Sequence, residues 1–240
     1  MQIENSVALV TGANRGIGAQ FVAHLLARGA AKVYAGARRP ESLAAVVAAA
    51  GGRVVPVQMD IDDPASVNAA AAFASDVNLL INNAGVLAFG GPLDGDPSQI
   101  ARDMETNYFG TLRSCRAFVP VLEATGGGAI VNVLTIIALA PMPGLGGYSA
   151  SKAAAYSMTQ ALRAQLRDRN ITVHGVFPAG VDTDMLAGVD AEKADPSDVV
   201  AAALDGLVAG TEDITTGSAS DLAYAAWLAN PKDLETMLAS

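Results

Sequence analysis

The chain has 240 residues, of which 51% are hydrophobic, and it carries 15 basic and 24 acidic side chains, a formal net charge of −9. This length suffices for one large hydrophobic core, so we expect a single domain over residues 1–240. The negative charge opposes binding to the phosphates of nucleic acids and to anionic membrane surfaces, so neither is expected as a partner.

Cysteine usage and hydropathy bear on the compartment. Cys115 is the single cysteine, so no intrachain disulfide can form and nothing requires an oxidising environment. The first residues lack a signal-peptide pattern, and no apolar run approaches the ~18 residues of a membrane span. We therefore expect a cytoplasmic protein.

Short apolar runs alternate with longer alanine- and leucine-rich stretches, which is typical of strand-helix-strand units around a parallel sheet. Strands are predicted at residues 7–10, 32–35, 54–58, 78–81, 129–134 and 172–177, and helices at 18–27, 41–50, 65–73, 98–123 and 149–169. Residues 214–216 suit a brief edge strand before helical turns at 222–228 and 232–238. Since the strands show little polar alternation, helices should cover both faces. The pattern predicts an α/β fold with a doubly wound parallel sheet.

A glycine-rich loop, residues 11–18, follows the first predicted strand and opens the first helix. Its glycines permit a tight turn and let backbone N–H groups approach a pyrophosphate at the positive end of the helix dipole. An ordinary glycine turn is the alternative, which the position between a strand and a helix disfavours. The residues expected to bind a dinucleotide here are Gly12, Asn14, Arg15, Gly16, Ile17 and Gly18.

The end of the second predicted strand bears on the choice of cofactor. An acid there would accept hydrogen bonds from both ribose hydroxyls of NAD, but this chain has Arg38 and Arg39 instead. Guanidinium groups make charge-assisted contacts to a 2′-phosphate, and Arg15 can approach the same group. The sequence predicts NADP(H), with arginines that merely solubilise a loop as the alternative. After the third predicted strand, Asp60 and Ile61 would contact the adenine, or Asp60 would only cap the next helix.

Tyr148 and Lys152 are the candidate chemical pair. They lie four residues apart at the start of a predicted helix, so both side chains project from one face. A neighbouring cation favours the phenolate and lowers the pKa of a tyrosine from ~10 towards the range useful for proton transfer. The same spacing is common on exposed helix faces, so the pair gains its weight from the motifs around it.

Five ordered segments in the first 185 residues resemble the short-chain dehydrogenase/reductase family. They are the loop at 11–18, Asn82-Asn83-Ala84-Gly85, Asn107-Tyr108-Phe109-Gly110, residues 148–152 and residues 178–183. The resemblance implies a single-domain Rossmann fold, with a cofactor half over about 1–125 and a catalytic and substrate part over about 126–240. It implies that Tyr148 is the acid/base, that Lys152 lowers the phenol pKa and binds the nicotinamide ribose, and that Asn107 holds a water in a proton relay.

The resemblance also implies a hydroxyl 13 positions before the tyrosine, which is Thr135 in this chain. The family usually has serine there, and the extra methyl of threonine should crowd a substrate carbonyl and reduce tolerance for bulky ketones. Ala179 departs from a common glycine, and Gly180 can supply the flexibility instead. The remaining cofactor contacts implied are Asn83, Ala84, Gly85, Pro178, Gly180, Val181 and Thr183.

The sequence therefore predicts an NADP(H)-dependent oxidoreductase, similar to a carbonyl reductase, that reduces a ketone or aldehyde to an alcohol reversibly. A regulatory sensor that binds NADP(H) without turnover and an NAD-dependent alcohol dehydrogenase are the alternatives. An apolar or aromatic substrate should contact Leu87, Phe89, Met142, Leu145, Phe177, Met185 and Leu186. No metal site is predicted, because His24 and His174 lie in separate elements without a ligand spacing.

A homodimer is the expected assembly. In the family, two long helices pair across a two-fold axis, and here they correspond to residues 98–123 and 149–169. Their apolar positions should form the self-complementary surface: Phe118, Val119, Val121, Leu122, Met158, Leu162 and Leu166. The glycine-rich terminal strand of the family is replaced by residues 211–217 and a helical tail, which should remove the tetramer interface.

Overall fold

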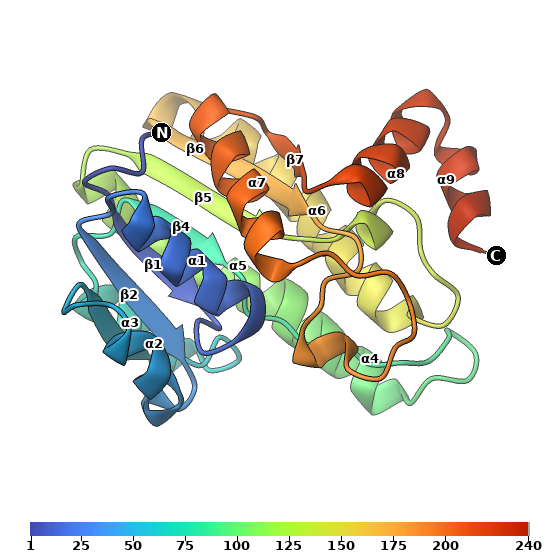
Figure 1. The fold of residues 1–240 in the computed structure, drawn as a ribbon, viewed down its shortest axis with the longest axis horizontal. Coiled ribbons are helices and arrows are strands. Elements are labelled where there is room, and N and C mark those ends of the chain that lie inside the picture. The colour runs from blue at the N-terminus through green and yellow to red at the C-terminus, as the bar shows by residue number, and fades with distance from the viewer. Residues whose placement is uncertain (240) are drawn as a thin grey trace.

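Seven parallel strands form the centre of the computed structural model, which describes residues 1–239. Their order in the sheet is β3-β2-β1-β4-β5-β6-β7, so the order reverses between β1 and β4 (Figure 1). The strands are β1 (Val7–Thr11), β2 (Lys32–Ala37), β3 (Val54–Gln58), β4 (Leu79–Asn82), β5 (Gly128–Val133), β6 (Ile171–Phe177) and β7 (Asp213–Thr215). The predicted doubly wound sheet is confirmed, and the short edge strand β7 completes it.

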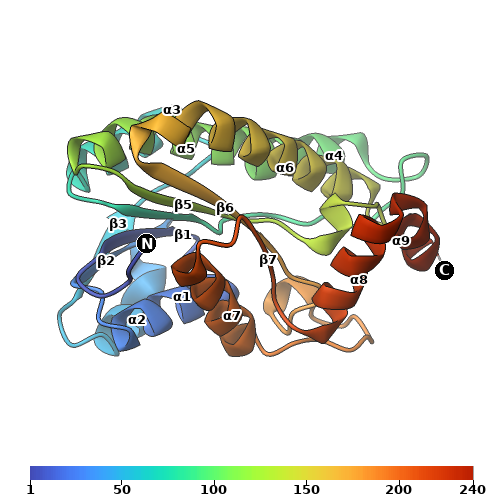
Figure 2. The same ribbon diagram turned by 90° about the horizontal axis from the view of Figure 1, so that it is seen from above.

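Helices cover both faces of this sheet, as Figure 2 shows edge-on. One face carries α1 (Gly16–Ala27), α2 (Ala44–Ala48) and α7 (Pro196–Ala209), and the other carries α3 (Pro64–Phe73), α4 (Pro97–Met104), α5 (Thr111–Ala124) and α6 (Gly146–Leu166). Two large clusters of buried side chains correspond to the two interfaces, one containing Phe21 and Leu204 and the other containing Phe118 and Leu166. Burial on both faces explains why the strands lack polar alternation.

Four helices begin in the same way, with Asp or Asn at the N-cap and proline directly after it. In α3, α4, α7 and α9 (Pro231–Leu238) the capping side chain accepts a hydrogen bond from the N–H two residues on. The cap satisfies a backbone donor that the helix leaves free, and proline suits the first helical position because it has no N–H to satisfy. We did not predict α7, although Asp195-Pro196 and the terminal Gly210 at φ 77° mark both of its ends.

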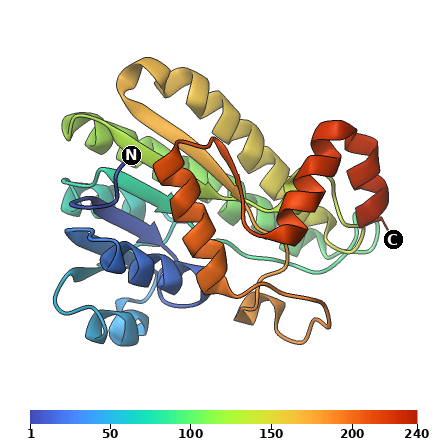
Figure 3. The ribbon, with the colours of Figure 1, turned by 45° about the horizontal axis from the view of Figure 1, so that its top comes forward.

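Two predicted helices are more broken than their sequences indicate. Residues 98–123 are divided by a π-helical turn at Glu105–Gly110, between α4 and α5. Residues 41–50 form a 3₁₀ turn at Pro40–Leu43 followed by the short α2. The predicted tail is confirmed as α8 (Ser218–Ala229) and α9, which Figure 3 shows folded beside each other next to the carboxyl terminus. Among residues 1–239, no helix combines the length and apolar character that a membrane span requires.

The apolar surface proposed for subunit pairing needs correction. Phe118 and Leu122 on α5 are fully buried, and Leu166 on α6 is 1% exposed, because all three pack in the core of their own chain. Val119 and Met158 are also buried. These residues therefore cannot supply a free surface on the outside of the two helices. The exposed positions of α6 carry four small side chains and two glutamines instead, namely Ala150, Ser157, Gln160, Ala161, Ala164 and Gln165.

Candidate active site

A cavity of about 840 Å³ opens where the carboxyl ends of β1 to β6 meet the loops that follow them. In doubly wound folds this edge, at the point where strand order reverses, is where ligands bind. The cavity reaches from the loop after β3 to the loop after β6, which five strand spacings place about 24 Å apart. The predicted residues that line it are Gly12, Asn14, Arg15, Gly16, Ile17, Gly18, Arg38, Arg39, Asp60, Ile61, Asn83, Ala84, Gly85, Thr135, Tyr148, Lys152, Pro178, Gly180, Val181 and Thr183.

The glycine loop has a conformation that other residues would disturb. Gly12 and Gly16 have φ of +64° and +52°, in the left-handed region that side chains disfavour. A Cβ at Gly18 would lie only 2.1 Å from the Gly12 carbonyl oxygen. The residue before α1, Arg15, makes no side-chain cap. The first N–H groups of α1 therefore face the cavity without a capping oxygen, which suits an anion.

The end of β4 holds this loop in place. The Asn83 amide donates to the carbonyl oxygens of Thr11 at 2.9 Å and of Gly12 at 3.2 Å. The Thr11 hydroxyl oxygen in turn accepts from the backbone N–H groups of Asn83 and Ala84 at 2.9 and 3.0 Å. Asn83 thus supports the loop through its side chain while its backbone borders the cavity.

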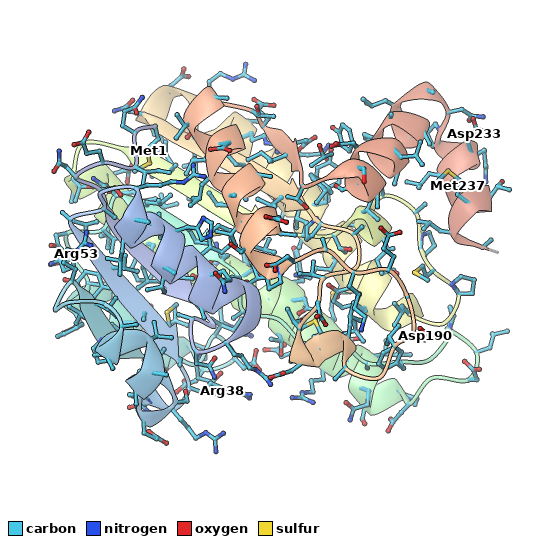
Figure 4. The ribbon with its side chains drawn as sticks, viewed as in Figure 1. Met1, Arg38, Arg53, Asp190, Asp233 and Met237 are labelled. Atoms are coloured by element: carbon cyan, nitrogen blue, oxygen red, sulfur yellow. The ribbon has the colours of Figure 1, made fainter. Side chains whose placement is uncertain are left out.

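The three arginines near the cavity differ in their partners. Arg38 and Arg39 are exposed and form no ion pair within residues 1–239, and Figure 4 shows Arg38 at the lower edge of the molecule. Arg15 instead bonds to the Asp184 carboxylate at 2.8 Å, and both side chains are about 70% exposed. Arg15 thus has an acidic partner, whereas Arg38 and Arg39 have none among the described residues, and the sequence did not predict this contact between distant segments.

Tyr148 and Lys152 lie on the first turns of α6 and border the opposite part of the cavity. They are 8% and 6% exposed, and Lys152 Nζ lies 5.9 Å from the centre of the phenol ring. Lys152 donates to the Val133 carbonyl oxygen at 2.8 Å. Burial lowers the pKa of Lys152 to about 8, and the Asp103 carboxylate opposes part of that change.

Burial opposes the lowering of the phenol pKa that is expected from Lys152. Burial raises the pKa of Tyr148 well above its ordinary value, and the negative charge of Asp103 raises it further. The phenol therefore keeps its proton at neutral pH. A protonated, buried phenol beside a cation is suited to donate a proton to an oxygen in the cavity.

Thr135 and Asn107 stand near this pair in different ways. The Thr135 hydroxyl lines the cavity and donates to the Pro178 carbonyl oxygen at 3.2 Å. Asn107 lies in the π-helical turn, is 1% exposed and does not border the cavity. Its side chain accepts from the Val86 N–H and donates to the Val86 carbonyl and the Ser151 hydroxyl, each at 2.9 Å. Asn107 therefore braces the loop after β4 against α6, rather than presenting its amide to the cavity.

Six of the seven predicted substrate contacts line the cavity: Leu87, Phe89, Met142, Leu145, Met185 and Leu186. Phe177 is the exception and a correction, because it is fully buried and packs edge-on against Tyr156, with ring centres 5.0 Å apart. Its place at the end of β6 pointed to the cavity, but its ring belongs to the core beneath α8. Leu238 of α9 also lines the cavity and was not predicted from the sequence. The apolar spacing of this terminal helix predicts a buried face, but it does not indicate that the face borders the cavity.

A family model described as short chain dehydrogenase matches residues 6–194. The chain belongs to this family. No group of three or more His, Cys, Asp or Glu side chains suited to a metal ion occurs in the part of this short-chain dehydrogenase that the structure describes.

Relatives of the chain carry several names. The short chain dehydrogenase pigC of Monascus ruber is 33% identical over 201 residues, which cover 78% of this chain and 66% of that protein. The probable oxidoreductase EphD of Mycobacterium tuberculosis is 34% identical, and the match covers 80% of this chain but 35% of that protein. The 2,5-dichloro-2,5-cyclohexadiene-1,4-diol dehydrogenase LinX of Sphingobium indicum is 32% identical, with 78% of each protein covered. The chain thus spans about two thirds or less of the first two relatives.

Solved structures extend the similarity over the whole chain. A short chain dehydrogenase from Burkholderia cenocepacia J2315 in complex with NADP has a TM-score of 0.94 and 43% identity, and all of both chains is covered. A short chain dehydrogenase/reductase from Burkholderia phymatum in complex with NAD has a TM-score of 0.85 and 26% identity, over 97% of this chain and 93% of that one. The fold and the family agree with the Rossmann architecture described above.

Proposed function

We propose that this chain is an NADP(H)-dependent oxidoreductase that reduces a ketone or an aldehyde to an alcohol, reversibly, with Tyr148 as the acid/base. One observation carries the proposal. Tyr148 and Lys152 are buried side by side on the wall of the same cavity that the glycine loop lines. A ligand that sits on the glycine loop and reaches the far wall brings its reactive end to a proton donor.

The cavity fits NADP(H) along its length. The glycine loop and the uncapped start of α1 suit the pyrophosphate, while the unpaired Arg38 and Arg39 suit a 2′-phosphate. Asp60 and Ile61 would border the adenine. Residues 83–85 and Pro178, Gly180, Val181 and Thr183 would border the pyrophosphate and the nicotinamide. The relative with NADP and 43% identity favours this cofactor, whereas the relative with NAD is only 26% identical.

The chain's own residues would handle the proton and the orientation. When bound, NADPH would supply the hydride for the carbonyl carbon. Tyr148 Oη donates its proton to the carbonyl oxygen, and the phenolate regains a proton from solvent. The Lys152 ammonium, which bonds to the Val133 carbonyl, would bind ribose hydroxyls and stabilise the transient phenolate. Thr135 would orient the carbonyl oxygen with its hydroxyl, at the expense of its bond to the Pro178 carbonyl.

The rest of the lining supports an apolar or aromatic substrate. Leu87, Leu145 and Leu238 contribute apolar walls, and Phe89 and Met185 are partly exposed at the cavity. Apolar walls favour a hydrocarbon or aromatic body around the carbonyl. A relative named for oxidation of a ring-bearing diol, LinX, is consistent with a cyclic substrate.

The test is a panel of cyclic, aromatic and short aliphatic carbonyl compounds, followed by NADPH absorbance and repeated with NADH. Turnover with NADPH that exceeds turnover with NADH supports the proposal. NADPH binding without turnover across the panel would identify the regulatory sensor, and faster alcohol oxidation with NAD would identify the third candidate.

We propose a homodimer that pairs through the outer faces of α5 and α6. Small residues on α6, such as Ala150 and Ala161, permit close approach of helices, and Phe109 is 43% exposed just before α5. This surface replaces the buried positions corrected above. A cytoplasmic location stays a prediction, as does the division at about residue 125 into a cofactor half and a catalytic part.

A further inference from the structure

A buried carboxyl group lies behind the wall of the cavity and takes no part in the proposed reaction. Asp103, near the end of α4, is 1% exposed and does not line the cavity. An aspartate buried to this extent is rare unless a partner compensates its charge. Asp103 therefore needs either a nearby cation or a proton of its own to compensate its charge.

The packing of α4 against α6 brings Asp103 close to the catalytic pair. A Cβ added to Gly147 would lie 2.9 Å from the Ile100 side chain, so the two helices touch one residue before Tyr148. Asp103 lies three residues after Ile100, on the same face of α4. The Asp103 carboxyl group therefore lies near the first turns of α6.

The loop after β4 contacts both Asp103 and Lys152. Asp103 Oδ2 accepts a hydrogen bond from the Ala88 N–H at 3.4 Å. Three residues earlier in this loop, a Cβ added to Gly85 would lie 3.6 Å from Lys152 Nζ. The same short loop therefore contacts both the carboxyl and the ammonium group.

The charged and titratable groups that face Asp103 are few. They are Lys152 and Tyr148 on α6 and Arg102 on its own helix, while the loop contributes the Ala88 N–H. Arg102 is exposed, so water screens its charge. Burial raises the pKa of Asp103, but the carboxyl ordinarily titrates so far below Lys152 that the pair is ionised near neutral pH.

We propose that Asp103 is the buried counter-ion of Lys152 and a positioning residue for the Tyr148 and Lys152 pair. Its negative charge keeps the buried ammonium protonated and keeps the phenol in its proton-donating form. The kinetic consequence rests on the proposed function, whereas the ion pair does not. Because the Asp103 carboxylate raises the pKa of both Lys152 and Tyr148, removing that charge should ease loss of the first proton, whichever group releases it.

The test is Asp103→Asn, which keeps an acceptor for the Ala88 N–H and removes only the charge. Its matched control is Glu105→Gln, since Glu105 lies two residues further along and pairs with Arg113. Nuclear magnetic resonance of isotope-labelled lysine in the cofactor-free protein should show the Lys152 titration about one pH unit lower in Asp103→Asn and unmoved in Glu105→Gln. Asp103→Glu, which restores the charge, should return the titration towards the parental value.

Kinetics give the second readout. The alkaline limb of NADPH-dependent carbonyl reduction should move to lower pH in Asp103→Asn by about the same amount. An unchanged Lys152 titration in Asp103→Asn overturns the counter-ion inference, whatever the turnover. A shifted titration in a chain that reduces no carbonyl compound supports the ion pair and overturns the proposed function alone. A shifted titration with an unmoved limb in an active enzyme overturns the positioning role.

Discussion

Arg38→Asp tests the choice of cofactor at the end of β2. Arg38 borders the cavity after β2, is exposed and forms no ion pair within residues 1–239. Against a 2′-phosphate it would make a charge-assisted contact worth about 1.5–3 kcal/mol, and water at this exposed position favours the lower value. Since about 1.4 kcal/mol is tenfold in affinity, NADPH should bind about tenfold more weakly, or worse with the added repulsion.

The assay is titration of NADPH and NADH into the parental chain and the variant, followed by cofactor fluorescence at two salt concentrations. NADH should keep its affinity or gain some, because a carboxylate accepts hydrogen bonds from the ribose hydroxyls. The advantage of NADPH in the parental chain should shrink as salt screens the phosphate contact. Arg167→Asp, an exposed arginine outside the cavity, serves as the control. Unchanged affinities for both cofactors in Arg38→Asp would refute the reasoning.

Three further outcomes follow from the geometry. Gly18→Ala should weaken NADPH binding more than tenfold and lower the Tm, because its Cβ would lie 2.1 Å from the Gly12 carbonyl oxygen. If calorimetry shows that both the NADPH affinity and the Tm of this variant are unchanged, the loop geometry is contradicted. Asp195→Ala should cost about 1 kcal/mol in urea unfolding through loss of the cap to the Ser197 N–H, and an unaltered midpoint would show that the cap contributes nothing. Light scattering should give the parental protein twice the 24.3 kDa chain mass, and the Phe109→Asp variant the mass of one chain. A parental protein with the mass of one chain would contradict the dimer.

Local signals predicted much of the fold and of the cofactor site. The glycine loop lies within one short segment, and so do Tyr148 and Lys152, which are four residues apart. The residue types and their spacing in each segment are enough to predict its local backbone geometry. Asp63 and Pro64 mark the start of α3 in the same way. Asp195 and Pro196 give the same signal at the start of α7, so this helix could have been predicted from the sequence.

What the sequence did not predict depends on burial and on contacts between distant segments. The cation beside Tyr148 was visible, but the desolvation that raises the phenol pKa exists only once α6 is packed. Arg15 and Asp184 are 169 positions apart, and nothing local joins them. Phe118 and Leu166 belong to apolar helix faces that the sequence predicts, but an apolar residue is equally suited to the core and to a subunit interface. In the structure, both residues lie in the core.

The most direct test of the central claim is the rate of NADPH-dependent carbonyl reduction by Tyr148→Phe, compared with Tyr156→Phe. Tyr156 is a second buried tyrosine of α6 that does not line the cavity and bonds to Asp213. If Tyr148 donates the proton, its phenylalanine variant should lose about 100-fold or more in kcat while NADPH affinity stays within about twofold, and Tyr156→Phe should keep its activity. A Tyr148→Phe variant that retains more than about a tenth of the parental rate would contradict the claim.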